Sequence, residues 1–307
     1  AAQPHRLWLL NVFEAPPAAL WAAASTYSLI ALVVMSLWRL KLRLSYEWWH
    51  GTHIVLAVLS VLAGVVHMVM WGFYLGDPVK RALWIGLAVL WVGLLVYVRV
   101  FRALFVLRRP YRVTEVRPER GQSWTLVMKP EGHEGLRFRP GQFAWLSLWG
   151  SAFKITQHPF SFSGSAAAPD GRVEITIREL GDHTRRISQV AVGSRMYIDG
   201  PYGAFTSGCP SDTQVLIAGG VGITPMMSII RTLADEGDKR PVILLYGSRD
   251  WDSITFREEL EAIQPRLNLK VVHVLSDPPP GWAGETGYID AAVLQRNVPA
   301  PHAANEY

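Results

Sequence analysis

The sequence predicts a multidomain membrane protein: a transmembrane segment of three α-helices, then a small antiparallel β-barrel, then an α/β domain with a parallel sheet. Three observations predict it. The first 108 residues hold only 12 of the 55 charged residues and include uncharged runs of 24, 29 and 17 residues. Short alternating apolar stretches, typical of antiparallel strands, follow from about residue 111. Strands that alternate with helices, as in parallel sheets, follow from residue 213.

The three uncharged runs are predicted to be membrane-spanning helices. At 1.5 Å per residue, each comes near or exceeds the ~30 Å core of a bilayer. The first two helices, 17–38 and 48–71, are longer than the ~7–15 apolar residues of a cleaved targeting segment. The third, 82–107, contains Arg99 and Arg102, whose side chains can reach the interface. The alternative is a buried helical hairpin in a large soluble protein.

Basic residues set the expected orientation. Eight Lys or Arg residues flank one side of the predicted helices and three flank the other. Because cytoplasmic flanks carry the excess of basic residues, everything after residue 108 is expected in the cytoplasm, beneath a plasma or bacterial inner membrane. The net charge of +5 then comes mostly from these basic residues beside the membrane, which attract anionic lipid. The lipid bilayer is therefore an expected partner, and nucleic acid is not.

Cys209 is the only cysteine, which excludes an internal disulfide, a thiolate iron–sulfur cluster and a Cys-based zinc site. His53 and His67 lie 14 residues apart in the second helix, so both rings share one face, ~21 Å apart along the axis. Ionisable residues in spanning helices are functional candidates, and His is a usual axial ligand of haem. One hypothesis is that the two histidines bind two haems stacked across the membrane. The alternative, which the spacing supports equally, is that His53 lies at the interface and His67 hydrogen-bonds a neighbouring helix. The small residues Ser60 and Gly64 could let a porphyrin or a helix approach closely.

A polar motif is expected in the barrel, whose strands are predicted at 123–128, 142–148, 172–177 and 195–198. The stretch His158-Pro159-Phe160-Ser161-Phe162-Ser163-Gly164 ends a strand. Proline fixes a turn there, and the hydroxyls and amides face one spot where a flavin or other phosphate-bearing ligand could bind. An ordinary barrel loop is the alternative. Arg178 and the run Gly181-Asp182-His183-Thr184, at an expected helix start, offer a cation and free amides that suit a pyrophosphate.

A glycine-rich loop is expected in the α/β part, with strands at 214–218, 242–246 and 270–275 and helices at 225–235 and 256–263. The stretch Gly219-Gly220-Val221-Gly222-Ile223-Thr224-Pro225 joins the first strand to the first helix. Glycine permits a tight turn, Pro225 suits the first helical turn, and the helix N-terminus then faces a phosphate. The G-x-G-x-x-G fingerprint is absent, so a nucleotide site of another kind is predicted, against a purely structural turn. Arg249, just past Tyr246, is either a cation for a 2′-phosphate or a solvated loop arginine.

In this order and spacing the motifs resemble the ferric reductase-like transmembrane family that includes the NADPH oxidases, over essentially the whole chain. The run Leu44-Ser45-Tyr46-Glu47-Trp48-Trp49 that leads to His53 and His67 is similar to the family's fifth helix. The run from His158 to Ser161 resembles its flavin motif, and Arg178 with residues 181–184 its flavin-phosphate motif. Residues 200–203 are similar to its barrel-closing turn, and 219–225 to its nicotinamide-nucleotide loop.

The resemblance implies an oxidoreductase with three domains, at 1–108, 109–210 and 211–307, that carry haem, FAD and NAD(P)H respectively. The residues it implies for FAD are His158, Pro159, Phe160, Ser161, Ser163, Arg178, Gly181, His183 and Thr184. Those implied for NADPH or NADH are Gly220, Gly222, Ile223, Thr224, Pro225, Tyr246 and Arg249. His53 and His67 would be axial ligands of two b haems.

The implied reaction is hydride transfer from nicotinamide C4 to flavin N5, near Ser161, and then passage of single electrons through the haems across the membrane. The terminal acceptor is open: dioxygen, a ferric chelate, a quinone or a redox partner protein all fit. One alternative is a haem-free, membrane-anchored flavin reductase that donates electrons to a partner protein. Another is a non-catalytic membrane subunit.

The chain also departs from the family. Its members usually have six spanning helices, of which the third supplies the other two haem ligands. They also continue, after the point that residue 307 matches, with a strand into Cys-Gly-Pro. We therefore expect a fragment cut at both ends that holds haem poorly. Gly287-Tyr288 stands where many NADPH users place a second arginine, so a preference for NADPH rests on Arg249 alone.

Overall fold

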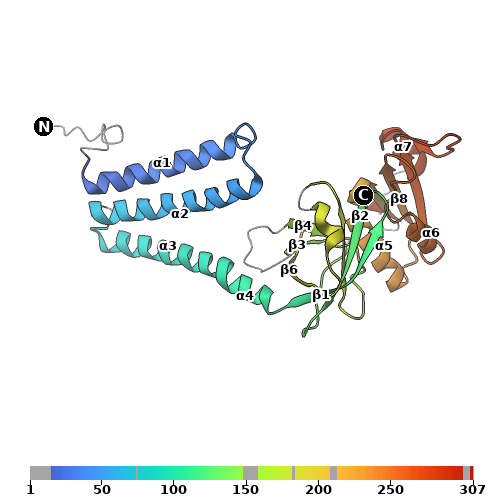
Figure 1. Ribbon diagram of the computed structural model, residues 1–307, viewed down its shortest axis with the longest axis horizontal. Coiled ribbons are helices and arrows are strands. Elements are labelled where there is room, and N and C mark those ends of the chain that lie inside the picture. Colours follow the sequence, from blue (N-terminus) through green and yellow to red (C-terminus); the bar gives the residue numbers. More distant parts are fainter. Residues whose placement is uncertain are drawn as a thin grey trace. The chain divides into compact units, whose positions relative to one another are not determined.

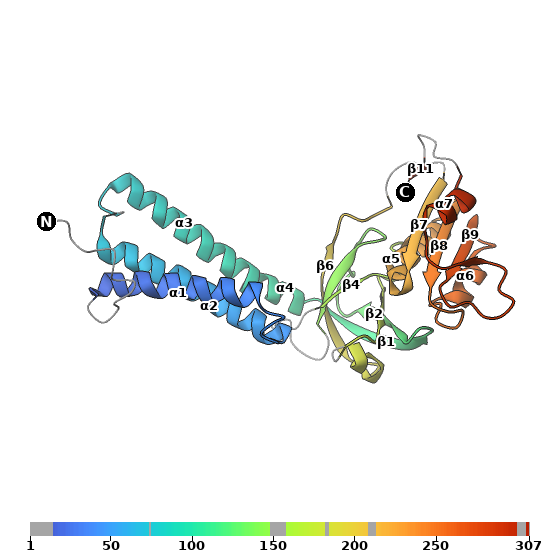
Figure 2. The ribbon, with the colours of Figure 1, turned by 90° about the horizontal axis from the view of Figure 1, so that it is seen from above.

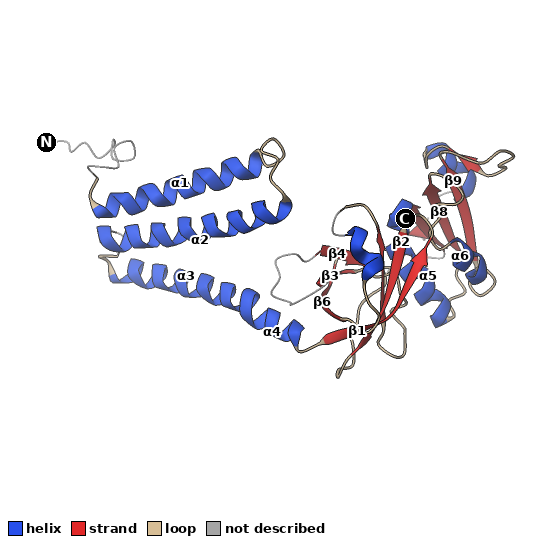
Figure 3. Ribbon diagram, viewed as in Figure 1, coloured by secondary structure: helices blue, strands red, loops and turns tan. Residues whose placement is uncertain are grey.

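The structure is a computed structural model that describes residues 15–299, except 74, 148–157, 182–183 and 208–212, and the backbone of 305–306. The chain divides into two compact units, Ala1–Arg102 and Ala103–Tyr307 (Figure 1). The first unit is helical. The second holds two β-sheets with their helices (Figure 3).

The helical stretches of the first unit begin and end where local sequence signals place them. They are α1 (Pro17–Leu37), α2 (Tyr46–Trp71) and α3 (Pro78–Val96), and the last continues through the π-helical turn η2 (Tyr97–Phe101) into α4 (Arg102–Leu107). The Ser45 side chain caps α2 by accepting from the Trp48 amide, and Asp77 caps α3. Gly72 ends α2 with φ +72°, a left-handed conformation that favours glycine.

Three of the described helical stretches are long and apolar enough to cross a membrane: Pro17–Leu37, Trp48–Trp71 and Pro78–Leu107. The three predicted helices are therefore confirmed as helices of spanning length. Most of their large apolar side chains are exposed, including Leu29, Val61 and Leu90. Such surfaces on a helix are unusual in water and ordinary in lipid.

Small residues bring α1 and α2 together, and the two helices run side by side (Figures 1 and 2). Ser25 Oγ donates to the Ser60 carbonyl over 2.8 Å, and Ser60 Oγ donates to the Ser25 carbonyl over 3.0 Å. A Cβ on Gly64 would lie 3.3 Å from Ser25 Oγ. Of the two partners that Ser60 and Gly64 were expected to admit, the structure places a helix there.

The first sheet of the second unit has six antiparallel strands in the order β4-β3-β6-β1-β2-β5. They are β1 (Pro110–Glu119), β2 (Ser123–Pro130), β3 (Phe143–Ser147), β4 (His158–Ser161), β5 (Val173–Arg178) and β6 (Arg195–Tyr202). The predicted small antiparallel barrel is confirmed as a barrel-like sheet. Among the described residues the sheet does not close through a paired ladder: β4 and β5 stand at its two ends, and the segment just after β4 meets β5 through the bridge between Phe162 and Ile175 and the hydrogen bond from the Ser163 amide to the Glu174 carbonyl. Inward-facing side chains such as Leu126, Met128 and Leu146 form the core of this sheet.

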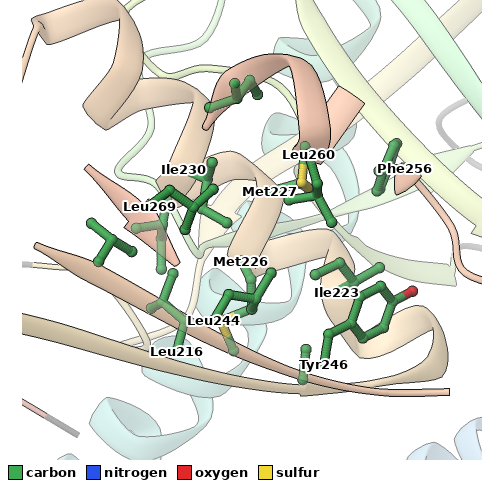
Figure 4. Packing of buried hydrophobic residues seen from close by; sticks show 14 of the residues in the cluster. Leu216, Ile223, Met226, Met227, Ile230, Leu244, Tyr246, Phe256, Leu260 and Leu269 are labelled. Atoms are coloured by element: carbon green, nitrogen blue, oxygen red, sulfur yellow. The ribbon is translucent and has the colours of Figure 1, made fainter. Parts of the chain in front are cut away.

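The second sheet is parallel, in the order β10-β9-β8-β7-β11. Its strands are β7 (Thr213–Gly219), β8 (Val242–Ser248), β9 (Leu269–Leu275), β10 (Glu285–Thr286) and β11 (Asn305–Glu306), and its helices are α5 (Ile223–Glu236), α6 (Arg257–Ile263) and α7 (Ala291–Asn297). The predicted alternation of strands and helices is confirmed. Alternate strand residues face opposite sides: Leu216 and Leu244 pack under α5 and α6 (Figure 4), whereas Val215 packs with α7.

Candidate functional site

The predicted flavin motif forms an edge strand. Residues His158 to Ser161 make up β4, which pairs with β3 from Leu146–His158 to Phe143–Ser161. Pro159 is tolerated because an edge strand does not need every amide for pairing. The expectation that this proline fixes a turn is therefore wrong. The strand instead presents its alternating side chains in an extended row, with Pro159 exposed and Ser161 half-buried.

Ser163 follows this strand and is fully buried. Its hydroxyl accepts a hydrogen bond from Thr176 Oγ1 over 2.9 Å, and its amide donates to the Glu174 carbonyl over 2.8 Å. Thr176 in turn lies 2.8 Å from the hydroxyl of Thr125, which donates to Glu119. The Ser163 side chain thus belongs to a buried chain of hydroxyls within the sheet, and its predicted contact with FAD stays a prediction.

The predicted flavin-phosphate motif follows β5. Thr184 starts the 3₁₀ helix η3 (Thr184–Gln189), and its hydroxyl accepts from the amides of Leu180 and Gly181 over 2.9 and 3.0 Å. These bonds fix the bend that leads away from the end of the strand. His183 lies outside the described residues.

Arg178, the last residue of β5, has a buried Nε atom to which none of the described residues hydrogen-bonds. Its Nη1 atom lies 3.6 Å from the position of a Cβ on Gly220. The end of the first sheet therefore meets the glycine-rich loop of the second at this guanidinium. A buried, charged donor without a partner is costly in a folded protein, and it fits an anionic ligand.

The glycine-rich loop turns sharply between β7 and α5. Gly220 has φ +51°, and residues Gly220–Gly222 form a 3₁₀ turn before Ile223 begins the helix. Gly222 precedes α5 without a side-chain cap, and Thr224 Oγ1 donates to the Val221 carbonyl over 2.7 Å. Gly222 is exposed, whereas Ile223 and Thr224 are buried and Pro225 is half-buried. The first amides of a helix without a capping side chain are the arrangement that binds phosphate.

Tyr246 supports this loop from the sheet. Its ring is fully buried (Figure 4), and its hydroxyl donates to the Gly220 carbonyl over 3.2 Å. Burial raises the pKa of Tyr246, so the hydroxyl remains protonated and can donate. The residue predicted to contact the nucleotide therefore holds the loop by one hydrogen bond; direct contact with nucleotide stays a prediction.

Arg249 follows β8 and has a highly exposed side chain, with 79% of its surface accessible. Its Nε lies 4.0 Å from Asp277 Oδ2, and the Asp277 amide donates to the Arg249 carbonyl over 2.7 Å. Sequence reasoning missed Asp277 because it opens a proline-rich stretch that reads as a loop. Only the pairing of β8 with β9 places this carboxylate beside the arginine.

His53 and His67 of α2 both use Nδ1 to bind α1. His67 Nδ1 lies 2.7 Å from the Ala18 carbonyl, which can only accept, so Nδ1 carries the proton. His53 Nδ1 lies 3.2 Å from Ser36 Oγ, whose own proton goes to the Leu32 carbonyl over 2.8 Å. His53 Nδ1 is therefore also the donor. Each Nε2 is left with a lone pair, the state in which histidine ligates a metal.

Clusters of three or more His, Cys, Asp or Glu side chains that could hold a metal ion do not occur in the described part of the chain. His53 and His67 thus each offer a single ligand.

Two family profiles match the second unit. Residues 123–206 match the profile described as FAD-binding domain, and residues 216–306 match the oxidoreductase NAD-binding domain. This unit contains an FAD-binding domain followed by an oxidoreductase NAD-binding domain. Together they make it the flavin–nucleotide unit of the protein.

Curated relatives of the flavin–nucleotide unit include cytochrome b5 reductases. NADH-cytochrome b5 reductase 1 of Cryptococcus neoformans is 31% identical over 136 residues, which are 42% of this chain and 46% of that protein. NADH–cytochrome b5 reductase 1 of Arabidopsis thaliana is 32% identical over 138 residues, 43% of this chain and 49% of that protein. The chain thus spans about half the length of the curated relatives it matches. These relatives support the predicted FAD-binding and nucleotide-binding domains. They do not specifically support the predicted resemblance to the ferric reductase-like transmembrane family.

Solved structures share the fold. The cytochrome b5 reductase domain of Ulva prolifera nitrate reductase superposes with a TM-score of 0.55 and 19% identity, over 64% of this chain and 84% of that one. Flavohemoglobin from Malassezia yamatoensis, with bound FAD and heme, superposes with a TM-score of 0.56 and 18% identity, over 97% of this chain and 73% of that one.

Proposed function

We propose that the protein is a membrane-anchored, NADH-dependent flavin reductase that passes electrons to a redox partner. The position of the Arg178 guanidinium beside the loop at Gly220 carries this proposal, because it brings the predicted flavin-phosphate site next to the predicted nucleotide site. FAD, when bound, accepts a hydride from the nicotinamide and releases its two electrons one at a time. The NADH-cytochrome b5 reductases that the chain resembles support this direction of electron flow.

The residues of the flavin–nucleotide unit fit FAD. The orphaned Nε of Arg178 supplies a charged donor for the pyrophosphate. The extended β4 strand offers its backbone and the half-buried Ser161 hydroxyl along one edge of the sheet, where Ser161 is the proposed neighbour of flavin N5. Hydride transfer depends on the relative position of the two rings, so no residue is assigned here as a general acid or a nucleophile.

NADH is the proposed donor in preference to NADPH. The Asp277 carboxylate stands beside Arg249, the only arginine predicted for a 2′-phosphate. A carboxylate there repels a second phosphate and can accept a hydrogen bond from the 2′-hydroxyl of NADH. The arrangement therefore favours the nucleotide without the 2′-phosphate.

The three apolar helices are the proposed membrane anchor. Their length, their exposed apolar side chains and the excess of basic residues at one end support a position across the bilayer with the flavin–nucleotide unit in the cytoplasm. The bilayer is thus the first proposed partner and the electron acceptor the second.

A second candidate function is electron transfer across the membrane through two haems. The observation that favours it is the common state of His53 and His67, in which Nδ1–H is bonded to α1 and Nε2 is left as a ligand. Each histidine would hold one haem iron on one side, and a second ligand would come from another segment or chain. A ferric chelate or dioxygen would then be the acceptor.

The test uses the full chain purified in mild detergent. We expect FAD to copurify, NADH to bleach its absorbance, and cytochrome b5 or ferricyanide to restore it. A chain that binds no FAD after gentle purification would overturn the reductase proposal and favour a non-catalytic membrane subunit.

The haem candidate has its own readout. It requires a low-spin bis-imidazole spectrum that is lost in His53→Ala or His67→Ala and kept in His50→Ala. A full haem spectrum in both His53→Ala and His67→Ala would contradict the haem function and leave the reductase proposal unaffected.

A further inference from the structure

One face of helix α5 is polar although it is buried. Ser228, Arg231 and Thr232 stand three and four residues apart, so they share this face. All three are less than a tenth exposed. Ser228 Oγ donates to the Gly164 carbonyl over 2.8 Å, and Thr232 Oγ1 accepts from the Ala166 amide over 2.9 Å. The face therefore binds the backbone of the segment that directly follows the flavin-motif strand.

Arg231 is the centre of this face. Its Nη1 donates to the Ser163 carbonyl over 2.8 Å and lies 3.2 Å from Glu174 Oε2, while Nε and Nη2 donate to the two carboxylate oxygens of Glu259 over 2.7 and 2.6 Å. The guanidinium also lies 5.0 Å from the ring centroid of Phe256. All three nitrogens are thus used, and they join the first sheet, α5 and α6 at one point.

Arg231 remains charged although it is buried. Burial acts to lower its pKa, but the hydrogen bonds to Glu259 and the charge of Glu174 outweigh burial, and the pKa is raised. Buried ion pairs of this kind often stabilise a protein no more than well-packed apolar side chains would. A role in fixing geometry accounts for the network better than a role in stability.

The position of the network relates it to both halves of the site. Ser163 lies two residues after Ser161, which ends the flavin-motif strand. On the nucleotide side, α5 begins at Ile223, directly after the glycine-rich loop. Arg231 lies about 12 Å farther along the axis of this helix. One helix therefore connects the nucleotide loop rigidly to the backbone of the flavin motif.

We propose that Arg231 is a positioning residue for hydride transfer, which sets the distance between the nicotinamide and the flavin by tying α5 to the Ser163 carbonyl. The inference rests on the proposed function and deepens it. Hydride transfer needs its atoms about 3–3.5 Å apart, and a misplacement of about 1 Å can cost about a hundredfold in rate. Arg231 touches neither cofactor, and it acts only through the two elements that it joins.

The chain offers a matched control. Arg120 also connects the first sheet to α6, by an ion pair with Glu258 of 2.7 Å, but this pair is more exposed than that of Arg231 with Glu259, and Arg120 is far in sequence from both motifs. Loss of Arg120 weakens the contact between the same two domains without touching the flavin-motif backbone. Arg120→Met therefore distinguishes a general weakening of the contact between the domains from loss of the hydrogen bond between Arg231 and the Ser163 carbonyl.

The experiment compares Arg231→Met, Arg231→Lys, Ser228→Ala and Arg120→Met in the FAD-loaded full chain. Stopped-flow flavin bleaching gives the rate of hydride transfer, and the long-wavelength charge-transfer absorbance reports stacking of nicotinamide on flavin. For Arg231→Met we expect a rate reduced about 10- to 100-fold and a weaker charge-transfer band, with the KM for NADH changed less than about threefold. Arg231→Lys should recover part of the rate, and Arg120→Met should stay within about twofold of the wild type.

Each outcome decides the proposal. It is overturned if Arg231→Met bleaches within twofold of the wild type, or if Arg120→Met slows bleaching as much as Arg231→Met does. If Arg231→Met fails to fold, Ser228→Ala decides, because it removes only the hydroxyl bonded to Gly164; a rate reduced about threefold or more supports the proposal, and an unchanged rate overturns it. No bleaching in the wild type would instead refute the proposed function itself.

Discussion

The Arg178 guanidinium ends the flavin-binding sheet directly beside Gly220 of the nucleotide loop, with Nη1 3.6 Å from where a Cβ on that glycine would stand. The two residues are 42 positions apart in the chain, and each belongs to a different domain. Nε of this arginine is buried and bonded to none of the described residues, and on this ground we propose that the guanidinium binds a phosphate of the cofactor.

Replacement of Arg178 by methionine should weaken FAD binding. Methionine keeps the aliphatic length of the side chain and removes its charge and donors. A hydrogen bond to a charged group contributes about 1.5–3 kcal/mol, so we expect about a 10- to 100-fold higher Kd for FAD by fluorescence titration. Arg296→Met, which removes an exposed ion pair with Glu285, is the control and should bind FAD like the wild type. Equal FAD affinity in the wild type and Arg178→Met would contradict the assignment.

Gly220→Ala should destabilise the nucleotide loop through its backbone. Space exists for a methyl group, but φ is +51°, and an L-residue pays about 1–2 kcal/mol in that region. We expect a lower unfolding midpoint and a raised KM for NADH. Gly219→Ala is the matched control, because Gly219 has φ −131° and an added Cβ would meet nothing within 4 Å. If the two variants behave alike, strain at Gly220 is not the cause.

The α/β part could be predicted from the sequence because its signals are local. Apolar strands of five to seven residues, a glycine turn and an amphipathic helix recur in order, and the observed bounds of β7, β8 and α6 differ from the predicted ones by at most two residues. Strand β1 was missed. Its outward positions carry Arg112, Glu115 and Arg117, so charge hides the alternation of its buried side chains.

The least predictable parts depend on contacts between distant segments. No local sequence signal marks Ser228, Arg231 and Thr232 as buried, and only the fold brings Ser163 and its neighbours onto them. The same holds for closure of the first sheet: the alternating pattern predicts the antiparallel strands of a barrel, and only the pairing of distant segments determines whether its two end strands join. Periodicity reports which face of an element is apolar, and it does not report a buried polar face.

Thr176→Val should cost the protein about 1–3 kcal/mol of unfolding free energy. Valine matches threonine in shape but leaves the buried hydroxyls of Ser163 and Thr125 without the partner between them. Chemical unfolding followed by tryptophan fluorescence measures the loss. Thr114→Val serves as the control, since Thr114 is exposed and makes one long hydrogen bond to the Val127 carbonyl, and it should change stability by less than about 0.5 kcal/mol. A Thr176→Val chain as stable as the wild type would refute the hydroxyl chain.

His273 should make the flavin–nucleotide unit less stable in acid. Its ring packs against Tyr246 and Trp251, and burial, with the nearby charge of Arg257, lowers its pKa from 6.5 to about 4. The folded state then binds the proton less tightly than the unfolded state does. Its stabilising effect is complete above about pH 6.5 and is lost as the pH falls toward 4, a loss of about 1–3 kcal/mol after allowance for partial exposure.

The variant His273→Phe keeps an aromatic ring in this position and removes the titration. Between pH 7 and 4, the unfolding midpoint of the variant should therefore fall less than that of the wild type, and the two curves should run parallel above pH 7. A wild-type and a variant curve of the same slope throughout would show that this histidine does not carry the acid sensitivity.

Asp277 is expected to determine nucleotide preference. Its carboxylate stands 4.0 Å from Nε of Arg249, and the backbone hydrogen bond between these residues holds them in register. Asp277→Asn removes the charge that repels a 2′-phosphate and leaves the arginine free to bind it. Two unit charges about 4 Å apart in water interact by about 1 kcal/mol, so the ratio of kcat/KM for NADPH to that for NADH should rise about fivefold. Adding Arg249→Ala to Asp277→Asn should return the ratio toward the wild-type value, because no cation would then remain to bind the phosphate. An unchanged ratio in Asp277→Asn would place the 2′-position away from this pair.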